Sequence, residues 1–436
     1  MRTPKLLAAI VVFATLAAAC SEDAPTTINT GSTTTIAKAV VDCQTAVSVV
    51  ACAPKASTID KLLPSKATKA TGTPIRIGTI NQDTGPVAAF PELTSADKVA
   101  IDFINTELNG VDGHPIELVT CDTKGDPNIS QSCAQQMITK KVVAVIGGID
   151  IWGTGIQTLS DNGIPLVGGI PVSFESVRGA TSFQFSGGTW GAALGMAQYA
   201  MDTLKAKKLA VIYAEFPPIT DAGKLVEKAI IAHGGTASLI TVAVLGGDMA
   251  LALNQAAATN PDAVLALTAD TGCVPTIKTA KQIALKVPLM LTGACAAPKI
   301  VADLGDAVEG KIFNLESDLT PNNPDSVLYR AVSNRYGPKY KYEAQSAGTL
   351  SFKSVMILYG VLRKIGADNV TPKTIVAAFR ASNNEPAFSG HSYTCDGKQL
   401  PGYPAMCSPQ QTLGQIENGA IKQVTPWLDI AAWLKG

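Results

Sequence analysis

The sequence predicts an α/β protein of two lobes, each built on a largely parallel sheet flanked by helices. Near-continuous apolar runs alternate with segments in which apolar residues recur every three or four positions. The runs are rich in Val, Ile and Leu, which is typical of strands buried on both faces of a parallel sheet. About 360 residues follow position 73, and a chain of that length usually needs more than one hydrophobic core.

The first lobe is predicted from a β-α-β-α-β pattern. Its first helix has one apolar face that includes Val99, Ala100 and Phe103, spaced as on a helix packed against a sheet. Strands are expected over 74–80, 114–122, 142–148 and 164–169, with helices over 95–108, 128–140 and 154–163.

A second cycle follows. It comprises helices over 190–206, 221–234, 249–260 and 275–286 and strands over 208–214, 236–245, 262–269 and 287–293. Ligands of open α/β sheets bind outside the carboxyl ends of the strands. Two facing lobes therefore place a ligand site in the cleft between them.

The first 19 residues are typical of an export signal. Arg2 and Lys5 precede an apolar run over 6–16, and three alanines follow it at 17–19. The run is shorter than the roughly 20 apolar residues that a spanning helix requires. We therefore expect a cleaved signal peptide, and no segment of the mature chain that spans a membrane.

The motif LAAAC, ending at Cys20, resembles a bacterial lipobox. This resemblance implies that Cys20 becomes the lipidated N-terminus; the alternative is an exported protein without a lipid. Residues 20–73 are rich in Ser, Thr, Ala and Lys, a composition that buries little apolar surface. We expect a flexible tether there, with the lipid as the only contact to the membrane.

Eight further cysteines form an even set, as in disulfide-bonded exported proteins. They fall into sequence neighbours: Cys43 and Cys52, Cys121 and Cys133, Cys273 and Cys295, Cys395 and Cys407. We expect four sequential disulfides. Metal ligation is the competing interpretation, but no C-x-x-C motif occurs and the three histidines are scattered.

Composition and motifs limit the classes of function. The chain is 46% hydrophobic and 16% charged, with 35 basic and 35 acidic residues, and no basic stripe indicates nucleic acid. The stretch 305–312 matches part of a phosphate loop, but Ile312 replaces the Ser or Thr that would hold magnesium. We expect no catalysis, no cofactor and no metal.

From about residue 75 to 427, the chain resembles the type I periplasmic binding proteins, in particular the branched-chain amino-acid-binding family of ABC importers. The resemblance is carried by the order and spacing of TGPVAAF, CDTKGDPNISQSCAQQMI, VVAVIGG, DNGIPLVGG and AQSAGTLSFKSVMILYGVL. It implies a three-segment hinge, with lobe 1 formed by 74–193 and 318–390 and lobe 2 by 194–317 and 391–436.

The resemblance also indicates which loops contact a ligand. Phe90 and Trp152 are expected to offer aromatic faces, with lobe packing as the alternative for each. Gly153 and Thr154 lie where a helix N-terminus can receive an anion or a carbonyl group. Ile170 and Ser173 lie in GGIPVSF, where the family commonly places small residues and a Thr.

Two departures from the family put a leucine-type ligand in doubt. Ile170, Pro171 and Val172 do not keep the polar clamp, and Ala294 stands where the family's acid is expected. Replacement side chains follow two strands in the second lobe: Tyr213, Glu215 and Asp270. Exposed loop acids are common, so a surface role for Glu215 and Asp270 stays open.

The function expected from the sequence is capture of a small organic solute, an amino acid or a related compound, for delivery to an ABC permease. The protein is expected to be a monomer on the outer face of the cytoplasmic membrane. The first alternative is a ligand-sensing lipoprotein of the same fold that feeds a signalling system, and the second is an extracytoplasmic enzyme.

Overall fold

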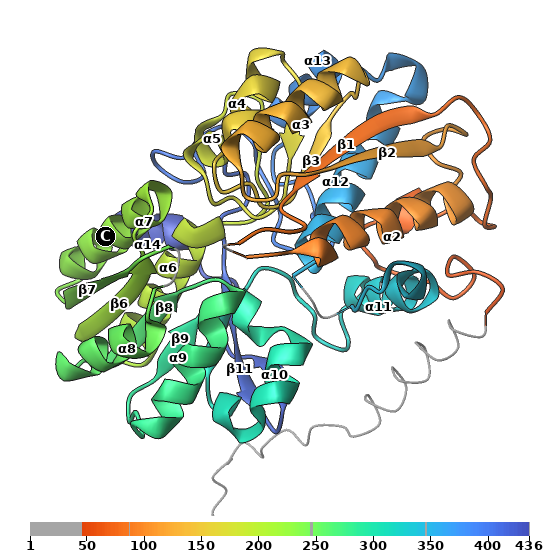
Figure 1. The fold of residues 1–436 in the computed structure, drawn as a ribbon. Helices are drawn as coiled ribbons and strands as arrows, with labels where there is room; N and C mark the ends of the chain where they lie inside the picture. Colours follow the sequence, from red (N-terminus) through yellow and green to blue (C-terminus); the bar gives the residue numbers. More distant parts are fainter. Residues whose placement is uncertain (1–45, 87, 245–246, 345–346, 436) are drawn as a thin grey trace, which may run out of the picture.

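The computed structural model describes residues 46–435, except for residues 87, 245–246 and 345–346. Two largely parallel sheets, each covered by helices, form two lobes that lie side by side (Figure 1). The α/β two-lobe architecture predicted from the sequence is therefore confirmed.

The sheet of lobe 1 has the strand order β2-β1-β3-β4-β5, and every pair in it is parallel. The strands are β1 (Ile75–Asn81), β2 (Ile116–Asp122), β3 (Val145–Gly147), β4 (Leu166–Val167) and β5 (Ser182–Phe183). Parallel pairing brings the carboxyl ends of β1, β3 and β4 to one edge of the sheet, where a ligand site is expected.

Helices from two distant parts of the chain cover this sheet. They are α2 (Pro91–Glu107), α3 (Pro127–Thr139), α4 (Thr154–Asp161) and α5 (Phe174–Arg178), then α11 (Pro324–Tyr336), α12 (Thr349–Ile365) and α13 (Pro372–Arg380). The predicted apolar face of α2, including Val99 and Phe103, is fully buried with residues of α12 in one core. Helices after the second lobe thus return to the first, as the resemblance implied.

The sheet of lobe 2 has the order β12-β11-β10-β9-β8-β6-β7. Its strands are β6 (Lys208–Ala214), β7 (Thr236–Val242), β8 (Ala263–Leu267), β9 (Leu289–Leu291), β10 (Ile312–Leu315), β11 (Thr412–Glu417) and β12 (Ala420–Gln423). The β10–β11 and β11–β12 pairs are antiparallel and the others parallel. The last two strands belong to this sheet although the chain has visited lobe 1 in between.

The helices of lobe 2 are α6 (Gly188–Gln198), α7 (Pro217–Ala232), α8 (Met249–Ala258), α9 (Asp270–Gln282), α10 (Pro298–Leu304) and α14 (Ile430–Lys435). Short helical turns complete the chain: η1 (Asp60–Leu62), the π-helical η2 (Tyr199–Thr203), η3 (Gly293–Ala296), η4 (Gly305–Val308), η5 (Gly337–Tyr340) and η6 (Ala367–Asn369). In the part of the chain with described coordinates, no helix is both long and apolar enough to cross a membrane.

Three connections run between the two sheets: 184–187 after β5, 316–323 after β10, and 381–411 after α13. We call them crossings 1, 2 and 3. The predicted boundary between residues 193 and 194 falls inside α6, whose buried residues pack in the core of lobe 2. Lobe 2 therefore begins earlier, at Gly188, because α6 packs as one unit.

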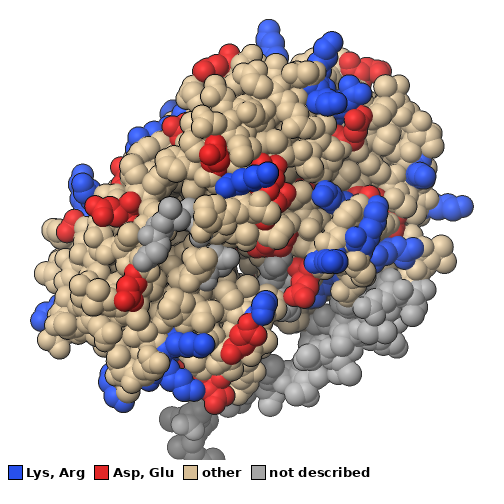
Figure 2. All heavy atoms as spheres, in the orientation of Figure 1, with Lys and Arg blue, Asp and Glu red and all other residues tan. Residues whose placement is uncertain are grey.

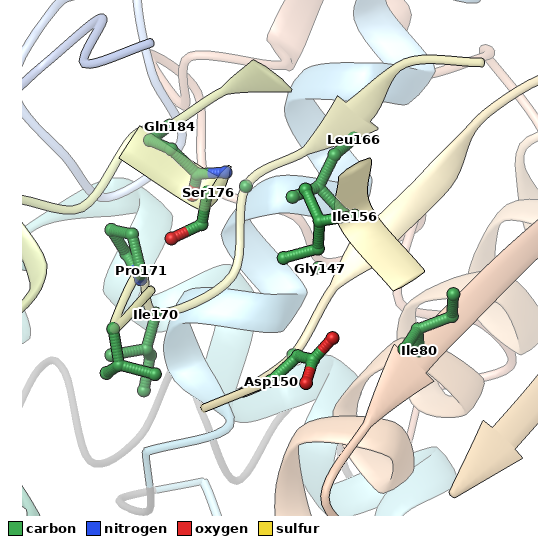
Figure 3. A pocket seen from close by; sticks show the side chains of 12 residues that line it. Ile80, Gly147, Asp150, Ile156, Leu166, Ile170, Pro171, Ser176 and Gln184 are labelled. Atoms are coloured by element: carbon green, nitrogen blue, oxygen red, sulfur yellow. The ribbon is translucent and has the colours of Figure 1, made fainter. Parts of the chain in front are cut away.

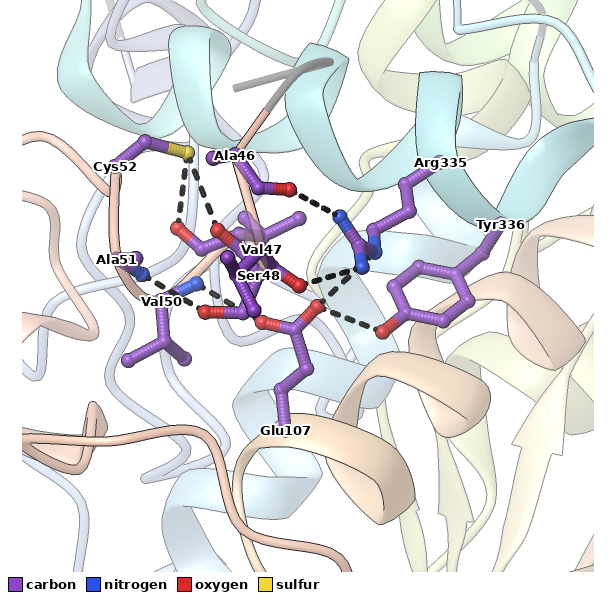
Figure 4. A network of polar contacts seen from close by, with 10 residues as sticks. Ala46, Val47, Ser48, Val50, Ala51, Cys52, Glu107, Arg335 and Tyr336 are labelled. Carbon is purple, nitrogen blue, oxygen red and sulfur yellow. Dashed lines mark hydrogen bonds and ion pairs between the residues drawn. The ribbon is translucent and has the colours of Figure 1, made fainter. Parts of the chain in front are cut away.

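The expectation of a flexible tether over 20–73 does not hold for residues 46–73, which we call the strap. Val49 and Ile59 are buried in the core of lobe 1, and the Val50 N–H donates to Glu107 Oε2 at 2.9 Å. Arg335 donates to the carbonyls of Ala46 and Val47 at 3.1 and 2.8 Å (Figure 4). A few apolar side chains and buried acceptors on the body are enough to hold a segment of polar composition.

Three predicted disulfides are confirmed: Cys121–Cys133 between β2 and α3, Cys273–Cys295 between α9 and η3, and Cys395–Cys407 within crossing 3. Cys43 lies outside the described residues, so its bond to Cys52 stays a prediction. The same holds for Cys20 and for the signal peptide, which also lie outside the described range.

Candidate functional site

The candidate site lies where β1, β3 and β4 end and their loops meet lobe 2. The Asn81 side chain joins two of these loops. Its Nδ2 donates to the carbonyl of Phe90 at 2.7 Å, and its Oδ1 accepts from the N–H of Ile149 at 2.9 Å. Asn81 is fully buried, so the two loops are fixed to each other at the edge of the sheet.

An apolar cluster forms on this frame. Its buried members are Ala88, Phe90, Leu93 and Ile149, and partly buried Ile151, Ile170, Val172, Ala269 and Ala347 pack against them. Ala269 follows β8 in lobe 2, so the cluster extends across the cleft. Side chains of this kind offer contact area to an apolar solute and no charge to a polar one.

A small pocket opens beside the cluster, between the loops after β3 and β4 (Figure 3). Its lining includes Gly147, Asp150, Ile170, Pro171 and Gln184. Gln184 is 1% exposed, and its Oε1 has no hydrogen-bond partner among the residues that the structure describes. A buried carbonyl oxygen of this kind would be satisfied by an O–H or N–H group that reaches it.

Asp150 occupies the position where a ligand anion was expected. Its Oδ1 accepts from the N–H of Trp152 at 3.3 Å, its Oδ2 accepts from Ser130 Oγ at 2.5 Å, and the Gly153 N–H also donates to it. Burial raises the pKa of Asp150, and the hydrogen bonds from Ser130 and the backbone oppose that rise. Since this carboxyl group already uses the turn before α4, a second anion there is disfavoured.

Trp152 lies at the rim of the cleft, 42% exposed. Its indole Nε1 donates to the carbonyl of Gly125 at 2.8 Å, so the N–H is not free for a ligand. The ring meets that of Phe216 edge-on, with 5.4 Å between centroids. Phe216 follows β6 in lobe 2, so this aromatic pair connects the two lobes.

Other predicted ligand residues form contacts within the protein, and their contact with a ligand stays a prediction. The hydroxyl of Thr154 donates to the carbonyl of Pro127 at 2.6 Å, and Gly153 is the left-handed N-cap of α4. Ser173 caps α5 and accepts from the N–H of Ser176. The Tyr213 ring is buried against Gly223 of α7.

Two predicted acids follow strands of lobe 2: Glu215 directly follows β6, and Asp270 begins α9. Glu215 is exposed, and its N–H donates to the carbonyl of Val242. Asp270 is the first residue of α9, and its side chain is outside what the structure describes. Of the nine predicted ligand residues, Phe90 and Ile170 are the two that the structure brings together in the apolar cluster.

Sequence reasoning missed Ile149, Val172, Gln184 and Ala269. The first, second and fourth are ordinary apolar residues in loops, which carry no signal of their own. Gln184 directly follows the last strand of the lobe 1 sheet. A polar residue at the carboxyl end of a buried strand is a signal that could have identified it.

Comparison with known proteins agrees with this architecture. The protein family described as Periplasmic binding protein matches residues 74–404, and the chain belongs to that family. Over 185 residues it is 31% identical to a Leu/Ile/Val-binding protein homolog 3 of Brucella melitensis, a match over 40% of this chain and 48% of the relative. The chain thus spans about half the length of this curated relative, and the predicted resemblance to branched-chain amino-acid binders is confirmed at the level of the family.

Two solved structures are similar in fold. A fatty acid ABC transporter substrate-binding protein from Thermomonospora curvata aligns with a TM-score of 0.70 at 16% identity, over 85% of this chain and 96% of its own. A solute-binding protein of an ABC transporter from Rhodopseudomonas palustris, in complex with 3,4-dihydroxy benzoic acid, aligns with a TM-score of 0.66 at 17% identity, over 82% and 98%.

Proposed function

We propose that this chain is the extracytoplasmic solute-binding component of an ABC importer, lipid-anchored through Cys20, which delivers its solute to a permease. The observation that supports this most directly is the apolar cluster that spans both lobes at the carboxyl ends of the strands. A solute that contacts loops of both lobes stabilises the closed form, which a permease can recognise.

The solute that this cleft suits has an apolar body and at least one hydrogen-bond donor. The apolar cluster takes the body, and Gln184 Oε1 accepts from the donor. Aromatic acids that carry hydroxyl groups and amino acids with large apolar side chains both have these parts. The structural relative that binds 3,4-dihydroxy benzoic acid and the curated Leu/Ile/Val-binding relative support the same two classes.

Basic and acidic residues balance in number. On the face shown in Figure 2, Lys and Arg are interspersed with Asp and Glu, and the chain has a formal net charge of +0. Selection of the solute therefore rests on the cleft rather than on long-range attraction of one sign.

The first experiment is a thermal-shift screen of residues 21–436 against leucine, isoleucine, valine, phenylalanine, hydroxybenzoates, fatty acids, polyamines and sugars. A ligand at 100 times its dissociation constant adds roughly 2.7 kcal/mol to the free energy of unfolding. Shifts with hydroxybenzoates or apolar amino acids are expected. A shift with polyamines or sugars alone would contradict the proposed ligand class.

Ile170→Asp places a charge in the apolar cluster and is expected to weaken the binding of a ligand found in the screen by at least about tenfold. Leu251→Asp is the matched control, because Leu251 is 55% exposed on α8. Equal affinity for both variants would remove the apolar cluster from the site.

A further inference from the structure

The three crossings between the lobes meet at two buried charged residues, Glu316 of crossing 2 and Lys353 of α12. Glu316 Oε1 accepts from the N–H of Gly187 at 3.2 Å and from Gln411 Nε2 at 2.7 Å. Gly187 belongs to crossing 1 and Gln411 to crossing 3. The carboxylate of one residue in crossing 2 therefore binds both of the other crossings.

Lys353 adds a second set of contacts at the same place. Its Nζ donates to the carbonyl of Phe185 in crossing 1 at 3.0 Å and to the carbonyl of Glu316 in crossing 2 at 2.7 Å. Because Lys353 lies on α12, in lobe 1, it holds both connections to that lobe. The amide of Gln411 extends the network, since its Oε1 accepts from Asn314 Nδ2 at 3.1 Å.

These two residues are costly to bury and therefore need their partners. Glu316 is 8% exposed and Lys353 is 3% exposed. Burial lowers the pKa of Lys353 to about 8, and the nearby Glu316 charge opposes that shift. Burial raises the pKa of Glu316, and Lys353, Ser186, Gln411 and Gly187 oppose it. A buried charge that loses its partners is strongly destabilising.

The position of this network differs from that of the other contact between the lobes. The Trp152–Phe216 pair joins loops at the rim of the cleft, whereas the polar network joins the crossings themselves. When two lobes rotate about a hinge, atoms on the axis move little and atoms at the rim move far.

We infer that Glu316 and Lys353 are hinge-positioning residues that tie the three crossings into one pivot, about which lobe 2 turns while the Trp152–Phe216 contact separates. The pivot explains why two charged side chains are buried away from the apolar cluster. Its use in transport rests on the proposed function, but the pivot itself is tested in protein without ligand, so each can fail alone.

The test measures the distance between the lobes in the full mature chain. Spin labels carried by a non-natural amino acid at Lys140 and Leu251, both exposed and on different lobes, leave the disulfides intact. The wild type is expected to show discrete distance peaks. Lys353→Met removes both hydrogen bonds from Nζ to the crossings. We expect a single broad distance distribution in place of the discrete peaks.

Two further variants separate positioning from stability. Glu316→Gln keeps an acceptor for Gly187 and Gln411, so its peaks are expected to stay, whereas Glu316→Ala is expected to broaden them. Lys339→Met is the control, because it breaks a surface ion pair with Asp102 on lobe 1. If Lys353→Met and Glu316→Ala only lower the melting temperature and keep the wild-type peaks, the residues are merely structural and the inference is overturned.

A measurement on the unaltered protein covers the case in which the variants do not fold. The Gly187 N–H is buried in the pivot, so its hydrogen exchange should be as slow as that of the central strand β8, and the 214–217 loop at the rim should exchange faster. Gly187 exchange as fast as that of the rim loop would refute the pivot.

Discussion

Asp325 is the residue on which the attachment of the strap depends most. It is 3% exposed and accepts four hydrogen bonds. Three come from the strap: Ser57 Oγ at 2.6 Å, the Thr58 N–H at 2.8 Å and Thr58 Oγ1 at 2.8 Å. The fourth comes from the Ser389 N–H in crossing 3 at 2.7 Å. We predict that Asp325→Ala releases part of the strap without unfolding lobe 1.

The size of the effect follows from two competing states of the variant. If the strap stays, three of its donors lose their acceptor, at about 1–3 kcal/mol for each one that remains buried. If the strap leaves, Val49 and Ile59 become exposed, at about 1.5–3 kcal/mol each. The three lost hydrogen bonds therefore lower the free energy that holds the strap on the body by at least about 3 kcal/mol, which is roughly a hundredfold more release, and the apolar burial that still opposes release is of similar size.

Hydrogen exchange read by mass spectrometry distinguishes release from global destabilisation. Asp325→Ala should speed the exchange of residues 48–63 and leave that of β1 near the wild-type rate. Asp325→Asn keeps one acceptor oxygen and should give a smaller effect. Asp102→Asn, which alters the ion pair with the exposed Lys339 on lobe 1, is the control. Unchanged exchange of residues 48–63 in Asp325→Ala would show that apolar contacts alone hold the strap.

Three further predictions test other parts of the structure. Cys20→Ala should release the protein from membranes into the soluble fraction, and continued tight association would contradict the lipid anchor. Replacing both Cys273 and Cys295 by Ser should lower the free energy of unfolding by about 3 kcal/mol, because a 22-residue separation is closed by that bond; an unchanged denaturation midpoint would contradict this. The Asp97 carboxyl group is fully buried, and burial raises its pKa well above the ordinary 3.8 while Thr79 opposes the shift. The protonated form therefore stabilises the fold, and this contribution falls as pH rises above 3.8 toward the raised pKa; Asp97→Asn should flatten that fall in thermal melts, and an identical pH profile would contradict it.

The parts of the fold that were predictable are those in which one local pattern decides the structure. The strand predicted over 208–214 is β6 to the residue, because a continuous apolar run bounded by charged residues has few alternatives. The strand predicted over 164–169 is only Leu166–Val167, since the glycines at 168 and 169 adopt positive φ and leave the sheet. The helix predicted to begin at Pro275 begins at Asp270, because a proline is tolerated inside the helix there.

The site was less predictable, because a side chain's type does not show where its polar atoms point. Trp152 is predicted to contact a ligand, with lobe packing as the alternative. The carbonyl of Gly125 accepts its N–H and its ring packs edge-to-face with that of Phe216, whereas contact of its ring with a ligand stays a prediction. Ser173, predicted to contact a ligand, caps a five-residue helix, and its contact with a ligand stays a prediction. Both outcomes depend on residues distant in sequence or on local capping geometry. Three of the four predicted disulfides are confirmed in contrast, since spacing alone favoured sequential pairs.

The strap also determines how a lipid anchor would act on the two lobes. The described chain begins at Ala46, whose carbonyl is held by Arg335 of α11, and the strap continues along α2 through Glu107 and Asn105. All of these partners belong to lobe 1. With the anchor proposed at Cys20, lobe 1 is therefore the lobe that the membrane restrains, and lobe 2 is the one that turns about Glu316 and Lys353. Because residues 46–73 pack on lobe 1, they do not lengthen the linker to the proposed anchor, which keeps the cleft closer to the membrane and raises its effective concentration near a permease.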